Sequence, residues 1–383
     1  MADPLQEQTS FPFVMMRGGT SKAVFLTGAT LPPEGEDRDE VILSLFGSPD
    51  PRQIDGLGGA DILTSKLAII DPPSRSDADL DYTFAQISVS EPVVDYDINC
   101  GNCSAAVGAY AIDEGIVPAQ EPFTTVRIHN TNTGRVLLAE VPVVNGLAAV
   151  EGDFAIDGVP GSGAAIALDY SRTAGGITGA LLPTGQPRDV LHTATGPIEA
   201  TIVDLANVCV FIPAGAVGMT GTEGPDELAP SQVAAIDAVK RAAADLLNMP
   251  ADGLTPIPAV VAPPAPYTSY ASGEKVLAED CDLVARVVAG RPPVMHKAYP
   301  GTTAACTAVA GSIPGTTVHE AITLRRDGEL TIGHTSGVMR VGVRVRPDGD
   351  EWHVEQASYG RTARRLAEGR VFVRLGAFAP AGR

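Results

Sequence analysis

The sequence predicts an α+β protein of two similar domains, each a curved sheet or barrel wrapped around a buried central helix, with a cleft between them. Three observations predict this architecture. The chain has 383 residues, more than one ordinary domain usually holds. Short apolar stretches alternate with turns, in keeping with 41 glycines and 31 prolines. Each half also contains an Ala-rich segment that is apolar on every side, which is typical of a buried helix.

The first half contains one such helix among several strands. Strands are predicted in residues 13–27, on both sides of a glycine-rich bend, and in residues 63–70, 82–89 and 126–144. Residues 104–116 (SAAVGAYAIDEGI) predict the helix, and Glu114-Gly115 is typical of a helix C-terminus. Residues 182–196, rich in Pro, Gly and Thr, are the predicted linker.

The second half repeats this plan. Residues 203–213 resemble residues 17–27, since a polar bend precedes a short apolar strand in both. The segment CGNCSAAV aligns with TAACTAVA, which sets Cys100 against Thr303 and Cys103 against Cys306. A surface helix is predicted over residues 231–248, with Ser231 as N-cap and with Val233, Ile236, Val239 and Leu246 or Leu247 facing inward. The repeat predicts two helix starts that face each other across the cleft.

Composition excludes several classes of protein. The net charge of −19 disfavours binding to nucleic acid or to anionic membranes. No apolar run is long enough for a transmembrane helix, and the first residues lack the features of a signal peptide. Five cysteines, an odd number at irregular spacing, predict reduced thiols and a cytoplasmic protein.

Cys100 is the first candidate for chemistry. It stands in Cys100-Gly101-Asn102, just before the buried helix, where free backbone N–H groups and the helix dipole bind a carboxylate and lower the pKa of a thiol. Gly101 permits close approach of the backbone, and Asn102 can cap the helix or reach a ligand. The alternative is a small buried cysteine beside a capping asparagine, and the local sequence leaves both open.

Lys66 is the second candidate, because it interrupts an apolar strand. A buried ammonium needs partners or must be neutral. With an ordinary pKa, only about one lysine in a thousand to ten thousand is neutral at pH 7, so a lysine base needs burial or a neighbouring cation. The alternative is a lysine at a strand edge whose ammonium reaches water.

Three loops rich in hydrogen-bond donors are candidates for binding carboxylates. They contain Thr20 and Ser21, Thr302 and Thr303, and Ser336. The spacing of histidines and cysteines fits no metal site, and no dinucleotide or phosphate-loop motif is present. We therefore expect neither a metal nor a cofactor.

The chain resembles the PrpF family, which includes 2-methylaconitate cis–trans isomerase, 4-oxalomesaconate tautomerase and methylitaconate isomerase. The matching segments cover nearly the whole chain in order. They include MRGGTSKAVFL (residues 16–26), GSPDPRQIDGLGGADILTSK (47–66), CGNCSAAVGAYAIDEGIV (100–117), GDFAIDGVPG (152–161), YPGTTAACTAVAGSIPGT (299–316), IGHTSGVMRVG (332–342) and SYGRTARRLAEGRVFV (358–373).

The resemblance implies a diaminopimelate-epimerase-like fold. Its first domain would span residues 1–187 and be completed by the C-terminal strand, about residues 369–383, and its second domain would span residues 188–368. It also implies cofactor-independent isomerisation by allylic proton transfer on a small unsaturated di- or tricarboxylate such as 2-methylaconitate, aconitate or 4-oxalomesaconate. A homodimer follows by analogy.

The resemblance places Lys66 and Cys100 at the two reactive positions, and Thr20, Ser21, Gly101 and Asn102 around the substrate carboxylates. We expect Lys66 to be the base and Cys100 the acid or anion stabiliser, although the sequence does not fix their order. Two alternatives remain. An amino-acid epimerase or racemase would need a second thiol where the alignment sets Thr303, and a non-catalytic carboxylate-binding protein would have an unreactive Lys66 and Cys100.

Overall fold

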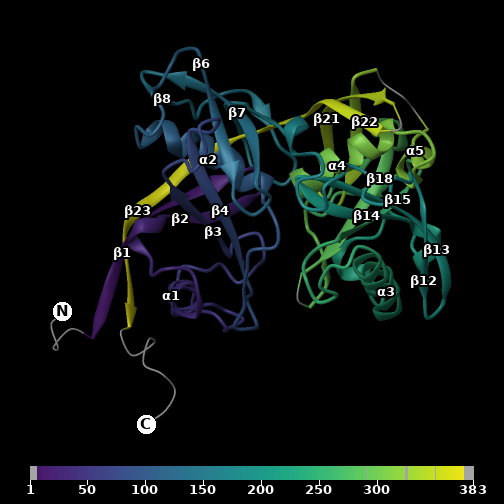
Figure 1. Ribbon diagram of the computed structural model, residues 1–383, viewed down its shortest axis with the longest axis horizontal. Coiled ribbons are helices and arrows are strands. Elements are labelled where there is room, and N and C mark those ends of the chain that lie inside the picture. Colours follow the sequence, from purple (N-terminus) through teal and green to yellow (C-terminus); the bar gives the residue numbers. More distant parts are fainter. Residues whose placement is uncertain (1–6, 291, 324–326, 350, 375–383) are drawn as a thin grey trace, which may run out of the picture.

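Two halves of the chain build two lobes that lie side by side (Figure 1). The computed structural model describes residues 7–290, 292–323, 327–349 and 351–374. Within these residues, no helix is both long enough and apolar enough to cross a bilayer.

The two halves contain the same succession of strands. The first has β1 (Gln8–Gly18), β2 (Ser21–Thr27), β3 (Lys66–Asp71), β4 (Leu80–Ile87), β6 (Phe123–Asn130) and β7 (Arg135–Val144). The second has β13 (Gly196–Leu205), β14 (Asn207–Pro213), β15 (Ile257–Ala262), β18 (Leu283–Ala289), β20 (Glu329–His334) and β21 (Gly337–Asp348). In both series the successive pairs are antiparallel, parallel, antiparallel, parallel and antiparallel. The predicted repeat and the strands predicted in the first half are confirmed.

Each half surrounds one central helix. All residues of α2 (Gly101–Asp113) except the last are buried, and so are all residues of α4 (Gly301–Ser312) except the last. Their alanines and glycines keep the helices thin, so the surrounding strands pack directly against them. Helix α2 begins and ends three residues earlier than predicted.

The helix starts correct the predicted alignment of the two halves. Helix α2 begins after Cys100, and α4 begins after Pro300. The residue in the second half that corresponds to Cys100 is therefore Pro300, whereas Thr303 corresponds to Cys103. The sequence alignment was three residues out of register because it matched cysteine to cysteine in two similarly small and apolar helices.

Three further helices cover the lobes: α1 (Glu36–Phe46), α3 (Pro230–Leu246) and the short α5 (Thr317–Ala321). Helix α3 confirms the predicted surface helix, and Ile236 and Val239 are buried as expected. The prediction of Ser231 as N-cap was wrong, because Ala229 occupies that position and Pro230 begins the helix. Leu246 is exposed, and its neighbour Leu247 packs against the core instead.

Long strands near the C-terminus join the lobes. Strand β22 (Glu351–Arg361) pairs with β21 of the second half and with β11 (Ile166–Asp169) of the first. Strand β23 (Ala363–Arg374) then pairs with β1 along its whole length, so the chain returns to the first lobe (Figure 1). The predicted domain boundaries remain a prediction, and residues 375–383 of the expected C-terminal strand lie outside the described residues.

The remaining strands are short. They are β5 (Val94–Asp95), β8 (Leu147–Ala148), β9 (Phe154–Ala155), β10 (Ser162–Gly163), β12 (Asp189–Thr193), β16 (Tyr267–Thr268), β17 (Lys275–Val276) and β19 (Val294–Met295). Strand β12 lies within the predicted linker and pairs with β13. Residues 182–188 of that linker lack regular structure, and residues 194–195 form the turn between β12 and β13.

Candidate active site

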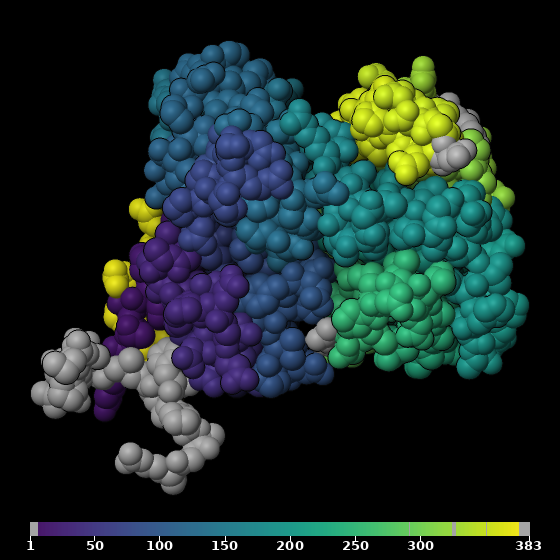
Figure 2. All heavy atoms as spheres, in the orientation of Figure 1, coloured from purple at the N-terminus to yellow at the C-terminus, as the bar shows by residue number. Residues whose placement is uncertain are grey.

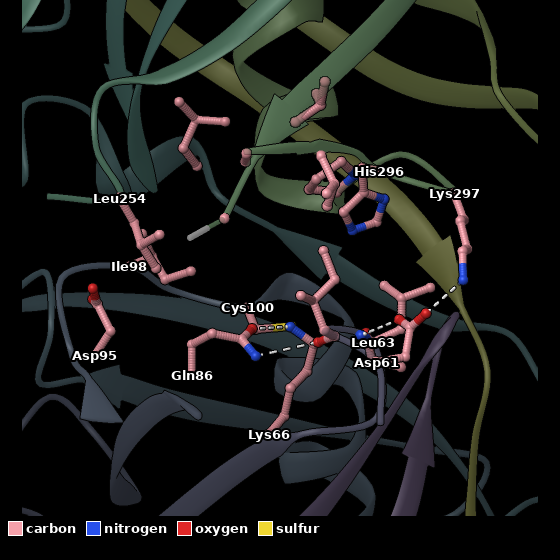
Figure 3. A pocket seen from close by; sticks show the side chains of 18 of the residues that line it. Asp61, Leu63, Lys66, Gln86, Asp95, Ile98, Cys100, Leu254, His296 and Lys297 are labelled. Atoms are coloured by element: carbon pink, nitrogen blue, oxygen red, sulfur yellow. Dashed lines mark hydrogen bonds and ion pairs between the residues drawn. The ribbon is translucent and has the colours of Figure 1, made fainter. Parts of the chain in front are cut away.

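A cavity of about 450 Å³ lies between the two halves. Figure 2 shows the hollow where the lobes meet in the lower part of the view. Lys66, Gln86 and Cys100 of the first half and His296 of the second line the cavity (Figure 3). Thr302 of the second half lines it as well. The structure therefore brings the two predicted reactive residues to one cavity at the junction of the lobes.

Cys100 occupies the N-cap position of α2. A hydrogen bond from the Cys103 thiol lowers its pKa, as do the positive charge of Lys66, the backbone N–H of Cys103 and the Ser21 hydroxyl, and together they outweigh the opposing effect of burial. The partner thiol of Cys103 responds in the opposite direction, because burial and the negative charge on Cys100 raise its pKa well above the ordinary value. Cys100 is therefore a thiolate at neutral pH, held by one thiol, one hydroxyl and the start of a helix.

Lys66 is the first residue of β3, and only 6% of it is exposed. Its cross-strand neighbour is Gln86, whose Oε1 accepts a hydrogen bond of 2.6 Å from Lys66 Nζ. The amide nitrogen of Gln86 donates to the backbone oxygens of Ser65 (2.9 Å) and Ile62 (3.3 Å), which keeps its carbonyl turned toward the lysine. The ammonium also lies 5.2 Å from the centre of the Phe84 ring. These contacts fix the position of the amine while leaving it in the cavity.

The bend between β1 and β2 packs against the start of α2. Gly19 has a φ of +49°, which favours glycine, and a Cβ there would lie 2.1 Å from Asn102 Oδ1. The close approach lets Asn102 Nδ2 donate to Thr20 Oγ1 (2.9 Å) and to Ser21 Oγ (3.3 Å). The two glycines before the hydroxyls are therefore needed to bring this bend onto the helix.

Four of the predicted carboxylate-binding residues line the cavity, namely Ser21, Gly101, Asn102 and Thr302. The other three do not. Thr20 lines a second cavity of about 570 Å³. Thr303 is fully buried, and its hydroxyl accepts a contact of 3.9 Å from the Cys209 thiol. Ser336 donates its hydroxyl proton to the backbone oxygen of Lys297.

Sequence reasoning missed several residues of the cavity. Asn207 at the start of β14 donates to Thr302 Oγ1 (2.9 Å) and to the backbone oxygen of Asn99 (3.0 Å), so it connects the two halves at the helix starts. Its register in the β13–β14 bend is that of Ser21 in the β1–β2 bend, and the resemblance of residues 203–213 to residues 17–27 already set it against Ser21, which was a signal for its role. Gln86 gave no signal beyond an ordinary alternating strand.

Among the described residues, the second helix start has no thiol that could act opposite Cys100. Pro300 precedes α4 and has no ionisable group. His296 lines the cavity, but burial lowers its pKa to about 4, so it is neutral at pH 7. Of the five cysteines, Cys100 alone is among the described lining residues, and the other four are buried. This arrangement does not fit two-thiol racemase chemistry.

Alkylation by iodoacetamide provides a direct measurement of the Cys100 thiolate. We expect the rate of Cys100 modification to rise with pH through a midpoint near 5, against an ordinary thiol pKa of 9.0. Because the shift is downward, modification should already be near its maximal rate at pH 7. The four buried cysteines should react slowly, and Cys100→Ser should remove the fast phase. A midpoint close to 9 would contradict the thiolate assignment.

Comparison with known proteins agrees with this geometry. The profile of the family described as PrpF protein matches residues 8–374. The 3-methylitaconate isomerase of Eubacterium barkeri is 48% identical over 96% of this chain and 98% of its own. The crystal structure of a methylitaconate-delta-isomerase has a TM-score of 0.79 at 46% identity and covers 99% of both chains.

A more distant structure supports the fold alone. A hydroxyproline epimerase from Agrobacterium vitis has a TM-score of 0.58 at 12% identity, over 98% of this chain and 94% of its own. The predicted epimerase-like fold with two similar lobes is thereby confirmed. The family profile matches nearly all of the residues that the structure describes. The chain therefore belongs to the PrpF family.

Proposed function

We propose that this protein is a cofactor-independent isomerase that moves a proton and a double bond within a small unsaturated di- or tricarboxylate. The observation that carries the proposal is the presence of the Cys100 thiolate and the Lys66 amine in one cavity that also contains two helix starts. The named activity of the Eubacterium barkeri relative supports the same class of reaction.

The substrate carboxylates would lie at the starts of α2 and α4. Backbone N–H groups at these positions have no partner within the helix, and they carry the positive end of the helix dipole. Thr302 adds a hydroxyl donor, because its oxygen already accepts a hydrogen bond from Asn207 and keeps its own proton to donate. Such donors stabilise the negative charge that develops on the substrate during proton removal.

Proton transfer would begin at Cys100. Its thiolate removes a proton from the carbon beside the C=C–COO⁻ group, and the electron pair spreads over the allylic system onto the carboxylate. The Lys66 ammonium then delivers a proton to the other end of that system, which shifts the double bond. A proton passing from the Cys100 thiol to neutral Lys66 restores both groups.

This order reverses the expectation from sequence, in which Lys66 was the base. The reason is electrostatic. The positive charge on Lys66 helps to lower the pKa of Cys100, so the site favours a thiolate beside the lysine. The pair can accept a proton at sulfur and donate one from nitrogen without any prior change of protonation.

Proton NMR in deuterated buffer tests the proposal. We expect the enzyme to introduce deuterium at an allylic carbon of at least one unsaturated acid, with 3-methylitaconate the first to be tried and 2-methylaconitate, aconitate and 4-oxalomesaconate beside it. Saturated acids of the same length should show no exchange, because their carbanions lack allylic delocalisation. Absence of exchange with every acid of the panel, in a protein whose Cys100 titrates as a thiolate, would contradict the proposed reaction.

Assembly and location remain predictions from the resemblance and the composition. We propose a cytoplasmic homodimer, and light scattering on purified protein measures its mass against 39.5 kDa for one chain.

A further inference from the structure

Arg361 is a buried arginine beside the start of α2. It is the last residue of β22, only 4% of it is exposed, and its guanidinium lies 4.6 Å from the centre of the Tyr359 ring. Within the described part of the chain, no carboxylate forms an ion pair with it. Burying an arginine without a counter-ion is costly. Its polar contacts therefore need an explanation.

The contacts of Arg361 are directed at Asn102. Its Nε donates a 2.8 Å hydrogen bond to Asn102 Oδ1, while its terminal nitrogens contact the Gly360 backbone oxygen (2.9 Å) and the Met339 sulfur (3.0 Å). An arginine has donors and no acceptor, so the Asn102 atom that faces it must be the oxygen. The guanidinium therefore fixes which way the Asn102 amide is turned.

The fixed amide in turn orients two hydroxyls. With its oxygen held by Arg361, Asn102 directs its NH₂ group to Thr20 Oγ1 and Ser21 Oγ. The Ser21 oxygen accepts this bond, so its own proton is free to point elsewhere. The Ser21 hydroxyl donates a hydrogen bond to Cys100. Of the contacts that lower the pKa of this sulfur, the one with the Cys103 thiol has the largest effect, and Lys66 and Ser21 add to it.

We propose that Arg361 is a positioning residue that acts through Asn102 to turn the Ser21 hydroxyl proton toward the Cys100 sulfur. The inference rests on the proposed role of Cys100. The series of hydrogen bonds from Arg361 to Cys100 has a charged group at each end, a guanidinium and a thiolate. Hydrogen bonds to charged groups are stronger than those between neutral groups. This series of hydrogen bonds also connects the Cys100 sulfur with β22, the strand that pairs with strands of both lobes.

Arg361→Met tests the chain without any need for substrate. We expect the midpoint of Cys100 alkylation to move up by about one pH unit, because the thiolate loses most of one directed hydrogen bond. In turnover assays the acid limb of the kcat/KM profile should move up by the same amount. Misplacement of the hydroxyl should lower kcat by about tenfold even at the optimum pH. Arg361→Lys retains a donor and should recover part of both effects.

Arg286→Met is the matched control. Arg286 is also fully buried, and its guanidinium lies 4.6 Å from the Tyr267 ring, but it donates to the backbone oxygens of Glu223, Ala285 and Gly333, none of which belongs to the reactive pair or to its contacts. Both variants should lower the melting temperature, and only Arg361→Met should move the alkylation midpoint. Equal midpoints in both variants would overturn the proposal.

A double-mutant comparison tests the route through Ser21. In a Ser21→Ala background, adding Arg361→Met should move the alkylation midpoint by much less than in the wild-type background. An undiminished shift would show that Arg361 acts by another route, and the proposed chain would be wrong. All these titrations remain informative if the protein fails to isomerise any acid tested, so failure of this inference is distinguishable from failure of the proposed function.

Discussion

Replacing Cys100 by serine should lower kcat by about a hundredfold to ten-thousandfold, the range that a positioned acid–base group contributes. Serine is nearly the same size, but its hydroxyl does not ionise near neutral pH even where a thiol becomes a thiolate, so the site loses its base. The contacts that lower the pKa of Cys100, namely those with Cys103, Lys66 and Ser21, would surround a neutral hydroxyl instead. Initial rates on the acid identified by NMR measure the loss.

Cys281→Ser provides the control for Cys100→Ser. Cys281 is fully buried in the second half and is absent from the residues that line the cavity. Its replacement should cost stability, roughly 1–3 kcal/mol for a buried hydroxyl without a partner, and the folded fraction should turn over at the wild-type rate. If Cys100→Ser retained wild-type kcat, sulfur would have no part in the chemistry.

The fold could be predicted because its signals are local. An Ala-rich helix that is apolar on all sides has no stable place except the interior, and the alternation of strands and turns around it predicts a wrapped sheet. The alignment between the halves failed at a place where local signals are degenerate. Both helices consist of small apolar residues, so a shift of three residues, close to one turn, preserves their pattern.

The meeting of Lys66 and Cys100 at one cavity could also be predicted, since a lysine inside an apolar strand and a cysteine before a buried helix are locally unusual. The residues that support the pair could not. Gln86 reaches Lys66 across a strand pair, and Arg361 reaches Asn102 from a position 259 residues further along the chain. Such contacts depend on strand register and on the return of the C-terminal strands, neither of which is encoded in a short stretch of sequence.

The assignment of roles within the pair illustrates the same limit. A lysine considered alone has to lose its charge to act as a base. In the sequence, burial was therefore the natural explanation of how Lys66 could become neutral. In the proposed mechanism the charged lysine has a function of its own, because its positive charge helps to lower the pKa of Cys100. Only the arrangement of the two groups in space decides which of them gives a proton and which accepts it.

Lys66→Met should reduce formation of the shifted isomer by about a hundredfold to ten-thousandfold while the fold survives. Methionine is close to lysine in length and can keep the packing against Phe84, but it has no proton to deliver and leaves Gln86 Oε1 without its donor. The loss of that bond should cost about 1–3 kcal/mol of stability. The loss of the positive charge should also raise the pKa of Cys100. Proton NMR of the isomerised product and thiol alkylation measure the two effects separately.

The two measurements also distinguish the possible roles of Lys66. If the lysine is the proton donor, formation of the shifted isomer should remain slow at every pH, including high pH where the thiolate of Lys66→Met is fully formed. If the lysine serves only to stabilise the thiolate, raising the pH should restore the wild-type rate, which would contradict the proposed proton delivery. Lys275→Met removes an exposed lysine from β17 and should change neither result. A Lys66→Met protein that forms the shifted isomer at the wild-type rate at neutral pH would remove the lysine from the reaction altogether.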